Sequence, residues 1–395
     1  MNDTSKRAIE LHKFNQGKLE VVSKIKIENA QDLSLVYTPG VGAVSREIAK
    51  DKNLARELTL NGRMVAIISD GSAVLGLGDI GPEAALPVME GKALLIKEFS
   101  GIDSFPLVID TNQPEEVITF VKQVAPTFSA INLEDIKAPN CFKIEESLQD
   151  LGIPVFHDDQ HGTAIVVSAA LMNSAKVVNK KYEDLKVGVI GAGAAGLAVS
   201  KMLLGANCRA DSCAFIEGLP RVKDVVIFDS KGAIYSGRDD LNIYKQAVAG
   251  ISNKQALKGS PEEVLKGFDV LVGVSGPGTI TSQMISNMAE KSIVFAMANP
   301  DPEIMPEDAK KAGAYVVATG RSDFPNQINN VLAFPAIFKI AHELKLKRIT
   351  MPVKIALVKA LASLVDNPSQ DEVIVSPFYP NLVDILVKKV VAQIK

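Results

Sequence analysis

Two pairs of adjacent carboxylates have the residue types and the spacing for metal chemistry. Glu134 and Asp135 follow one short apolar run, and Asp158 and Asp159 follow another. Each run is typical of a buried β-strand, and α/β enzymes place their chemistry where strands end. Clustered carboxylates without phosphate-binding lysines suit a hard divalent cation such as Mg²⁺ or Mn²⁺. We therefore predict a metal site with Glu134, Asp135 and Asp159 as ligands; a solvated acidic loop is the alternative.

Two histidines lie in the same segment as the second acidic pair. His157 and His161 could join the aspartates in a transition-metal site. The neighbouring sequence offers neither a third nitrogen ligand nor a thiolate. A site with oxygen ligands for Mg²⁺ or Mn²⁺ is therefore the favoured interpretation.

A lysine in a helical pattern is the candidate base. Oxidation of a secondary alcohol requires removal of its hydroxyl proton as hydride leaves. A lysine does this near neutral pH only if it is desolvated or lies near a cation. Lys92 lies in the helical pattern 82–98, where an apolar helix face beside a bound metal would provide both conditions. A solvated helix lysine is the alternative.

The segment GAGAAG, residues 191–196, fits the glycine pattern of dinucleotide-binding loops. The first glycine allows a tight turn, the second lets the backbone approach a pyrophosphate, and the third lets the helix pack on the strand. The motif follows a predicted strand and opens a predicted helix, whose N-terminal amides would bind the phosphates. We predict a dinucleotide site here; an ordinary glycine-rich turn is the alternative.

Asp229, at the end of the next predicted strand, favours NAD over NADP. Its carboxylate would accept a hydrogen bond from a ribose 2′-hydroxyl and would repel a 2′-phosphate. Ser230 and Lys231 follow it and could instead hold that phosphate. Asp229 lies further from the glycines than the usual spacing of about 20 residues. The excess, 207–220, reads as a surface insertion.

A tyrosine and two asparagines complete the candidate residues. Tyr37 precedes the turn 38–40, which fixes the backbone there, and its phenol could donate a proton. Asn299 follows a predicted strand near the expected nicotinamide end, and Asn330 lies in the segment PNQINNVLAFP. Neutral amides can hold a carboxylate or a carboxamide without adding charge. A packed tyrosine and two turn or capping asparagines are the alternatives.

The remaining pattern predicts an α/β protein of two domains, because apolar runs alternate with helical patterns in both halves and so indicate mostly parallel sheets. The first half has predicted strands at 64–69, 105–109, 128–133 and 153–156, and predicted helices at 82–98, 114–124 and 141–151. A long apolar helix, 162–178, joins the halves, and the later strands are 185–190, 225–228, 270–274, 293–298 and 314–318. We predict an N-terminal α/β domain over 1–155 and a Rossmann-like, doubly wound NAD(P)-binding domain over 156–395. Its helical C-terminal tail, 334–344 and 352–365, could complete either domain or an oligomer interface.

Composition and charge exclude several classes of function. The chain has 395 residues, of which 47% are hydrophobic and 23% are charged, an ordinary soluble profile. A net charge of −3 gives no reason to expect a nucleic-acid partner. The N-terminus lacks a signal-peptide pattern, and the most apolar long stretch, 187–206, is broken by glycines and a lysine. We therefore expect neither secretion nor a membrane span.

Three cysteines, Cys141, Cys208 and Cys213, bear on the redox environment. An odd and small number favours a reducing cytoplasm over a disulfide framework. Cys208 and Cys213 could be half of a zinc site, but the sequence has no second pair. We therefore predict two free thiols in a cytoplasmic protein.

Eight motifs together resemble malic enzyme of the compact bacterial type, and they extend over nearly the whole chain. They are YTPGV (37–41), SDGSAVLGLGDIGPEAALPVMEGKALL (69–95), INLEDI (131–136), FHDDQHGTA (156–164), VIGAGAAG (189–196), FDSKG (228–232), ANPDPE (298–303) and TGRSDFPNQINNVLAFP (319–335). The resemblance implies oxidative decarboxylation of (S)-malate to pyruvate and CO₂, with NAD(P) reduced. It also implies a Mg²⁺ or Mn²⁺ ion and at least a homodimer.

The resemblance assigns roles to the candidate residues. It makes Lys92 the base that takes the C2 hydroxyl proton of malate, and Tyr37 the acid that protonates C3 after CO₂ leaves. The metal would polarise the C2 ketone and stabilise the enolate. The other assignments are the metal ligands Glu134, Asp135 and Asp159, the cofactor-phosphate loop Ala192, Gly193, Ala194 and Ala195, and the amides near nicotinamide and substrate, Asn299 and Asn330.

Two features depart from the family pattern, and two other functions stay open. Larger malic enzymes carry an arginine where this chain has Ser72 and Ala73, so the partner of one malate carboxylate is not assigned. The insertion 207–220 weakens the choice of NAD. A malolactic-type decarboxylase that keeps NAD bound and releases lactate is one alternative. A non-catalytic nucleotide-sensing protein is the other; it predicts loss of Lys92, Tyr37 or a ligand carboxylate, and all are present.

Overall fold

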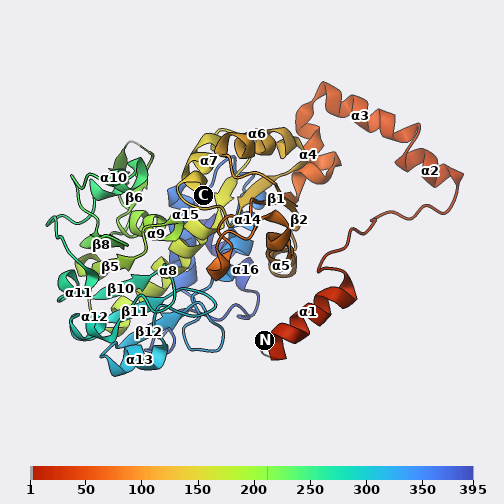
Figure 1. Cartoon of the computed structure of the whole chain (residues 1–395). Helices are drawn as coiled ribbons and strands as arrows, with labels where there is room; N and C mark the ends of the chain where they lie inside the picture. The colour runs from red at the N-terminus through yellow and green to blue at the C-terminus, as the bar shows by residue number, and fades with distance from the viewer. Residues whose placement is uncertain (1–2, 211, 395) are drawn as a thin grey trace.

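Two β-sheets flanked by helices organise the computed structural model, which describes residues 3–210 and 212–394 (Figure 1). The first sheet has the strand order β2-β1-β3-β4, and all of its pairs are parallel. Its elements are β1 (Met64–Ser69), α5 (Pro82–Ser100), β2 (Asp103–Val108), α6 (Pro114–Val124), β3 (Ala130–Leu133), α7 (Asn140–Leu148) and β4 (Val155–His157). Each helix thus returns the chain to the same end of the sheet, so the strand ends gather at one edge.

The second sheet has the strand order β12-β11-β10-β5-β8-β9. Its strands are β5 (Lys186–Ile190), β8 (Asp224–Asp229), β9 (Gly232–Ala233), β10 (Val270–Gly273), β11 (Ile293–Ala296) and β12 (Val316–Thr319), and only the short β9 pairs antiparallel among them. Strand β5 lies between β8 and β10, so the strand order reverses there, as in a doubly wound nucleotide-binding fold. The predicted α/β class is confirmed.

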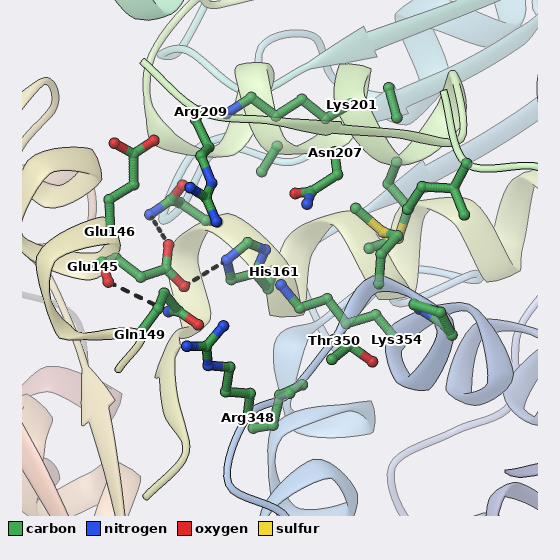
Figure 2. A pocket seen from close by; sticks show the side chains of 18 of the residues that line it. Glu145, Glu146, Gln149, His161, Lys201, Asn207, Arg209, Arg348, Thr350 and Lys354 are labelled. Atoms are coloured by element: carbon green, nitrogen blue, oxygen red, sulfur yellow. Dashed lines mark hydrogen bonds and ion pairs between the residues drawn. The ribbon is translucent and has the colours of Figure 1, made fainter. Parts of the chain in front are cut away.

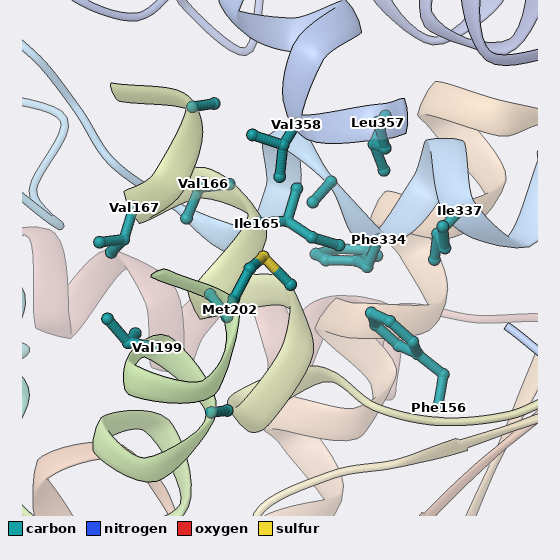
Figure 3. Packing of buried hydrophobic residues seen from close by; sticks show 14 of the residues in the cluster. Phe156, Ile165, Val166, Val167, Val199, Met202, Phe334, Ile337, Leu357 and Val358 are labelled. Atoms are coloured by element: carbon teal, nitrogen blue, oxygen red, sulfur yellow. The ribbon is translucent and has the colours of Figure 1, made fainter. Parts of the chain in front are cut away.

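Helix α8 (Asp158–Val177) joins the two sheets and carries much of the core between them. It packs against α9 (Ala194–Leu203) and α15 (Met351–Ala362). Figure 3 shows Ile165 of α8 among the side chains of Met202, Phe334 and Val358, and all four are buried. Burial of each such side chain contributes about 1.5–3 kcal/mol to stability. The acidic pair at the start of α8 is therefore fixed to a rigid element.

The start of α8 differs from the prediction, which placed it at Gly162. The helix begins at Asp158, directly after β4. Carboxylates are favoured in the first turn, where the peptide N–H groups are unpaired and the helix dipole is positive. Asp158 and Asp159 are consequently helical residues, about 100° apart around the axis, and their side chains point to different neighbours.

The helical tail returns to the first sheet. Helices α14 (Phe334–Glu343) and α16 (Leu382–Ile394) pack against α5, whereas α15 packs against α8. The tail therefore completes the core around the first sheet, one of the alternatives that the sequence left open. The remaining short helices are α10 (Ile243–Ala249), α11 (Pro261–Val264), α12 (Ser282–Ser286) and α13 (Pro306–Lys311), with the 3₁₀ turns η3 (Leu75–Leu77), η4 (Ala125–Thr127), η5 (Tyr182–Asp184) and η6 (Asn330–Leu332).

The N-terminal segment, residues 3–62, forms an arm outside this core. It contains α1 (Asp3–Asn15), α2 (Ala30–Val36), α3 (Gly40–Lys50), η1 (Lys52–Leu54), α4 (Ala55–Leu58) and η2 (Leu60–Gly62). Helices α1 to α4, all within the described part of the chain, have no buried residue. Figure 1 shows α2 and α3 projecting away from both sheets.

The prediction of two free thiols at Cys208 and Cys213 is wrong. The insertion folds as an antiparallel hairpin of β6 (Ala206–Cys208) and β7 (Cys213–Phe215), which places the two cysteines directly opposite each other. Their Cα atoms are 4.0 Å apart and the sulfurs form a disulfide. Cys141 is buried and free. The cysteine count therefore no longer argues for a reducing compartment.

None of the helices in the described ranges combines the length and the apolarity that crossing a bilayer requires.

Candidate active site

The two predicted acidic pairs meet at the carboxyl edge of the first sheet. Leu133, the last residue of β3, pairs with His157, the last residue of β4. The residues that follow are therefore neighbours in space. One carboxylate oxygen from each of Glu134, Asp135 and Asp159 lies within 4.8 Å of the others. The structure thus brings the three predicted metal ligands together.

The backbone of Asp135 adopts a left-handed conformation, with φ of +54°. Aspartate tolerates this region better than most residues. The turn directs its N–H to Asp159 Oδ2, at 2.8 Å, while its carbonyl accepts the N–H of Ala73 at 2.9 Å. The ends of β1, β3 and α8 are therefore tied to one another at the carboxylate cluster.

Lys92 reaches the cluster from α5. Its Nζ lies 2.7 Å from Glu134 Oε1, 2.5 Å from Asp158 Oδ2 and 4.0 Å from the centre of the Phe334 ring. Burial lowers the pKa of Lys92, but the Asp158 and Glu134 carboxylates outweigh burial and raise it. The side chain is 10% exposed, so Lys92 is desolvated, but the two carboxylates hold it as an ammonium, which can act as a base only when a cation offsets their charge.

Asp158 forms an ion pair with Lys92 and accepts a hydrogen bond from Asn330. The Asn330 amide donates to Asp158 Oδ2 at 3.1 Å and accepts from the Thr163 hydroxyl at 3.2 Å. Of the pair Asp158 and Asp159, only Asp159 was predicted as a site residue, so the role of Asp158 was not predicted. The sequence carried no signal that separates the two, because their side chains turn toward different partners only once the helix start at Asp158 is known.

The carboxylate cluster fits a hard divalent cation. Burial raises the pKa of Glu134, against the Lys92 ammonium, and the neighbouring carboxylates raise it further. Asn132 donates to Glu134 Oε2 at 2.7 Å, which leaves the carboxylate oriented toward the other acids. Asp158 Oδ1 is buried and has no hydrogen-bond partner among the described residues. A dication would relieve this concentration of negative charge, and its donors would be oxygens, as Mg²⁺ or Mn²⁺ prefers.

The two histidines do not add nitrogen ligands to this cluster. His161 turns toward Glu145, with 2.7 Å between its Nε2 and Oε1 of that carboxylate. His157 is fully buried, and its Nε2 lies 3.8 Å from Asp159 Oδ2. The geometry therefore favours the oxygen-ligated site over a transition-metal site.

The glycine loop has the geometry of a pyrophosphate site. It follows β5, and α9 begins within it at Ala194. A Cβ on Gly196 would collide with the carbonyl of Gly191, which explains the third glycine, whereas a Cβ on Gly193 would meet open space. The residues around the helix start, Ala192 to Ala195, thus leave room for phosphates beside unpaired N–H groups.

Asp229 is the last residue of β8, as predicted, but it is not free to bind ribose alone. Arg238 donates to both of its oxygens at 2.8 and 3.0 Å, and Lys245 donates to Oδ2 at 2.8 Å. The Lys231 N–H also bonds Oδ1, at 3.0 Å. Burial raises the pKa of Asp229, but Lys245 and Arg238 outweigh it and lower the pKa. Two cations that the sequence analysis missed therefore lie where a 2′-substituent is expected.

The remaining candidates differ in their placement. Asn299 follows β11, and its carbonyl touches Gly76 of the loop after β1 so closely that a Cβ there would collide. It therefore lies between the two sheets. Tyr37 is 67% exposed in the arm, between α2 and α3, and the chain does not bring it to the carboxylate cluster.

Comparison with known families decides the identity of this arrangement. A model described as the malic enzyme N-terminal domain matches residues 16–118 and 111–149, and one described as the malic enzyme NAD-binding domain matches 160–394. The chain belongs to the malic enzyme family. The expected resemblance is thus confirmed, and so is the pairing of an N-terminal α/β domain with a nucleotide-binding domain.

Individual malic enzymes match over most of their length. A bifunctional malic/malolactic enzyme of Bacillus subtilis is 52% identical over 94% of this chain and 88% of its own. An NADP-dependent malic enzyme of Halomonas elongata is 46% identical over 89% of this chain and 80% of its own. The crystal structure of an NAD-dependent malic enzyme from Thermotoga maritima superimposes with a TM-score of 0.90 at 44% identity, covering 97% of this chain and 98% of that one. The family therefore includes NAD- and NADP-dependent members.

Proposed function

We propose that this malic enzyme oxidises and decarboxylates (S)-malate to pyruvate and CO₂, with NAD or NADP as hydride acceptor. The position of Lys92 carries the proposal. Its Nζ lies within hydrogen-bonding distance of two buried carboxylates, one of them in the three-acid cluster. A base beside a dication site is the arrangement that alcohol oxidation followed by loss of CO₂ needs.

Two bound groups supply chemistry that side chains lack. A Mg²⁺ or Mn²⁺ held by Glu134, Asp135 and Asp159 supplies Lewis acidity, and a dinucleotide held at the loop 191–196 supplies the hydride acceptor. Asn330, which donates to Asp158, would orient the substrate, and Asn299, which contacts Gly76 of the loop after β1, would orient the carboxamide.

The chain itself moves the protons. Lys92 would lose its own proton once a bound dication offset the charges of Glu134 and Asp158, and its neutral Nζ would then take the C2 hydroxyl proton. Asp158, itself held by Asn330, fixes the direction of that nitrogen. The Phe334 ring, 4.0 Å from Nζ, excludes water from this side. Tyr37 returns a proton to C3 once CO₂ has left. In this proposal the two groups act at different carbons, Lys92 as base at C2 and Tyr37 as acid at C3.

The test follows the fate of C4. Malate labelled with ¹⁴C at the C4 carboxylate is incubated with the enzyme, Mn²⁺ and either dinucleotide. We expect labelled CO₂, pyruvate and reduced cofactor in equal amounts. Reduced cofactor without labelled CO₂ would mean simple dehydrogenation to oxaloacetate and would contradict the proposal.

A malolactic reaction is the second candidate, because the 52% identical Bacillus subtilis protein is named as a bifunctional malic/malolactic enzyme. In that reaction the cofactor stays bound, and the hydride returns to the nascent pyruvate. Lactate with labelled CO₂ and no net cofactor reduction would identify it. Appearance of both pyruvate and lactate would identify a bifunctional enzyme.

We infer that the cluster of Asp229, Arg238 and Lys245 lets the enzyme accept both dinucleotides. The charge of Asp229 favours NAD, but Arg238 and Lys245 offset it and can turn to a 2′-phosphate. Arg238→Gln should raise the KM for NADP about tenfold more than the KM for NAD. Lys258→Gln, on a lysine stacked over Tyr235, is the control. Equal effects on both cofactors would remove Arg238 from cofactor choice.

We also propose a homodimer in which the arm of each subunit packs on its partner. The arm exposes many large apolar side chains, a pattern that soluble monomers rarely show; they include Phe14, Val21, Val22, Ile25, Leu35 and Leu58. Lys18 anchors the arm's start to α5, with its Nζ 2.8 Å from the Pro87 carbonyl. Tyr37 lies beyond this anchor, so a partner's site is where its phenol can act.

A further inference from the structure

A second, positively charged cavity lies beside helix α8, apart from the carboxylate cluster. Its volume is about 510 Å³, within the range of about 300–1,000 Å³ that small-molecule sites occupy. The ends of α7 and α9, the starts of α8 and α15, and the β6–β7 hairpin enclose it. We call it the α8–α15 cavity. Its described lining includes none of Lys92, Glu134, Asp135 and Asp159.

Four cationic side chains line the cavity and come from three different parts of the chain. Lys201 lies on α9, Arg209 on the hairpin, and Arg348 and Lys354 at the start of α15. Figure 2 shows Arg209 and Arg348 reaching toward the space from opposite sides, with Lys354 beside His161. Such convergence of guanidinium and ammonium groups is the usual chemistry of anion sites.

The acidic residues of the cavity already have partners. Glu145 accepts from Gln160 at 3.0 Å and pairs with His161 at 2.7 Å, and Asp150 pairs with Arg348. These pairs leave Lys354 and Lys201 to act on the cavity, although Glu145 offsets part of the charge of both and the third acid of the lining, Glu146, offsets part of that of Lys201. The acids therefore position neighbouring groups and do not cancel the whole positive charge.

The burial of Lys354 without a hydrogen-bond or ion-pair partner among the described residues indicates that the cavity binds a ligand. Its side chain is 7% exposed, and no described residue hydrogen-bonds or ion-pairs with its ammonium. Burial lowers the pKa of Lys354 to about 8, with Glu145 opposing and Lys201 assisting. A buried ammonium without a direct partner is costly, and an anion in the cavity would remove that cost.

The start of α15 adds backbone donors to the same cavity. Thr350 and Met351 line it, and Thr350 makes no side-chain cap on the helix. The N–H groups of Met351 and Val353, on either side of Pro352, which has none, receive no side-chain cap from Thr350 and lie at the positive end of the dipole of this twelve-residue helix. Guanidinium, ammonium and helix-start donors together match the oxygens of a phosphate.

We propose that the α8–α15 cavity binds a small organic phosphate and that its occupancy tunes the active site through the first turn of α8. Gln160 and His161 belong to that turn and line the cavity, while Asp158 and Asp159, directly before them, face Lys92 and Asp135. A shift of this turn therefore reaches the lysine and the metal ligand. The coupling rests on the proposed malate oxidation, whereas the phosphate binding does not.

Binding is tested by isothermal titration of the full-length protein with inorganic pyrophosphate. Divalent metal is omitted because pyrophosphate chelates it, and saturating NAD fills the glycine loop. We expect one pyrophosphate per chain, with affinity weakened at least about tenfold in Lys354→Met. Lys359→Met, on the exposed face of the same helix, should bind as the wild type does.

Three binding outcomes would overturn the phosphate site. They are the absence of binding in the wild type, equal affinity in Lys354→Met, and displacement of pyrophosphate by an equal concentration of (S)-malate, which would make it a carboxylate site. If Lys354→Met fails to fold, Arg209→Gln on the exposed hairpin replaces it, with an expected weakening of about threefold or more.

Coupling is tested by malate saturation curves with glucose 6-phosphate as the probe at constant ionic strength. We expect the KM for malate to change about twofold or more in the wild type and not in Lys354→Met. An unchanged KM at a glucose 6-phosphate concentration that displaces pyrophosphate in the titration would overturn the coupling, but it would leave the binding site intact. Failure of malate oxidation itself would leave the binding result intact and contradict the proposed function instead.

Discussion

Lys92 lies between Asp158 and Glu134, and this position makes its replacement the most informative change at the residue scale. Lys92→Ala removes the proposed base, so kcat for malate should fall about 10³-fold with the metal and cofactor sites still occupied. Cofactor reduction in the presence of Mn²⁺ measures the loss. Lys97→Ala is the matched control, because Lys97 lies on the same helix and pairs with Asp103 at the surface. Near-normal turnover of Lys92→Ala would remove Lys92 as the base.

The charge of Asp135 is predicted to hold the metal. Asp135→Asn keeps the shape of the side chain and removes one negative charge, so Mn²⁺ affinity should fall by roughly tenfold or more. Electron paramagnetic resonance of free Mn²⁺ reports this affinity without turnover. Asp308→Asn, on the exposed face of α13, should titrate as the wild type does. An unchanged titration of Asp135→Asn would place the ligand elsewhere.

At the element scale, two glycines of the loop 191–196 have different roles: Gly196 is needed for packing, and Gly193 is needed for cofactor binding. A Cβ on Gly196 would collide with the Gly191 carbonyl, so Gly196→Ala should lower the free energy of unfolding by about 1–3 kcal/mol. Gly193 has open space around it and an ordinary φ of −89°, so Gly193→Ala should keep stability within about 0.5 kcal/mol.

The two glycine variants should also differ in cofactor affinity. The Cβ in Gly193→Ala occupies the path by which a pyrophosphate approaches the backbone, and loss of about 1.4 kcal/mol of contact is a tenfold weaker Kd for the dinucleotide. Urea unfolding and cofactor titration together check both statements. A stable Gly196→Ala, or a Gly193→Ala with normal affinity, would contradict this division of roles.

Helices and strands were predictable where the apolar pattern and the residues that typically begin or end an element indicated the same bounds. Helix α6 begins at Pro114 and ends at Val124 as expected, because proline and acidic residues open it and apolar spacing continues to its end. The meeting of Glu134 with Asp159 was predictable because parallel strands end at one edge. The start of α8 was not, because an Asp-Asp pair after a strand fits both a loop and a first helical turn.

Contacts that no local sequence motif indicates explain the other differences. The Cys208–Cys213 disulfide depends on the register of a hairpin, and the sequence contains no turn motif that predicts this hairpin. Arg238 and Lys245 reach Asp229 from later segments, and no local pattern indicates those contacts. The same holds for Lys354, whose exposure depends on how α15 packs against α8. The hairpin register decides the first of these contacts, and the packing of segments against one another decides the others.

At the scale of the whole molecule, the arm and the active site belong to different subunits in the proposed dimer. Mixing inactive Tyr37→Phe and Lys92→Ala subunits tests this. In a heterodimer with sites shared between subunits, one site carries both changes and the other carries neither. Random exchange in an equal mixture should therefore restore about a quarter of wild-type activity.

The same mixture distinguishes the alternative arrangement. If Tyr37 acted within its own chain, each site would carry one change and the mixture would stay inactive. Analytical ultracentrifugation of the two variants checks that both remain dimers, and affinity capture from a mixture in which only one variant carries a tag checks that they exchange subunits. A mixture of Lys92→Ala with itself gives the background.

The most direct test of the central claim is the absorbance at 340 nm when the enzyme is mixed with (S)-malate and Mn²⁺, run separately with NAD and with NADP. Pyruvate is assayed at the end of each run. The site described here predicts reduction of cofactor with an equal amount of pyruvate, and loss of both on removal of the metal. No reduction and no pyruvate with either cofactor would contradict the claim and favour a non-catalytic nucleotide-sensing protein.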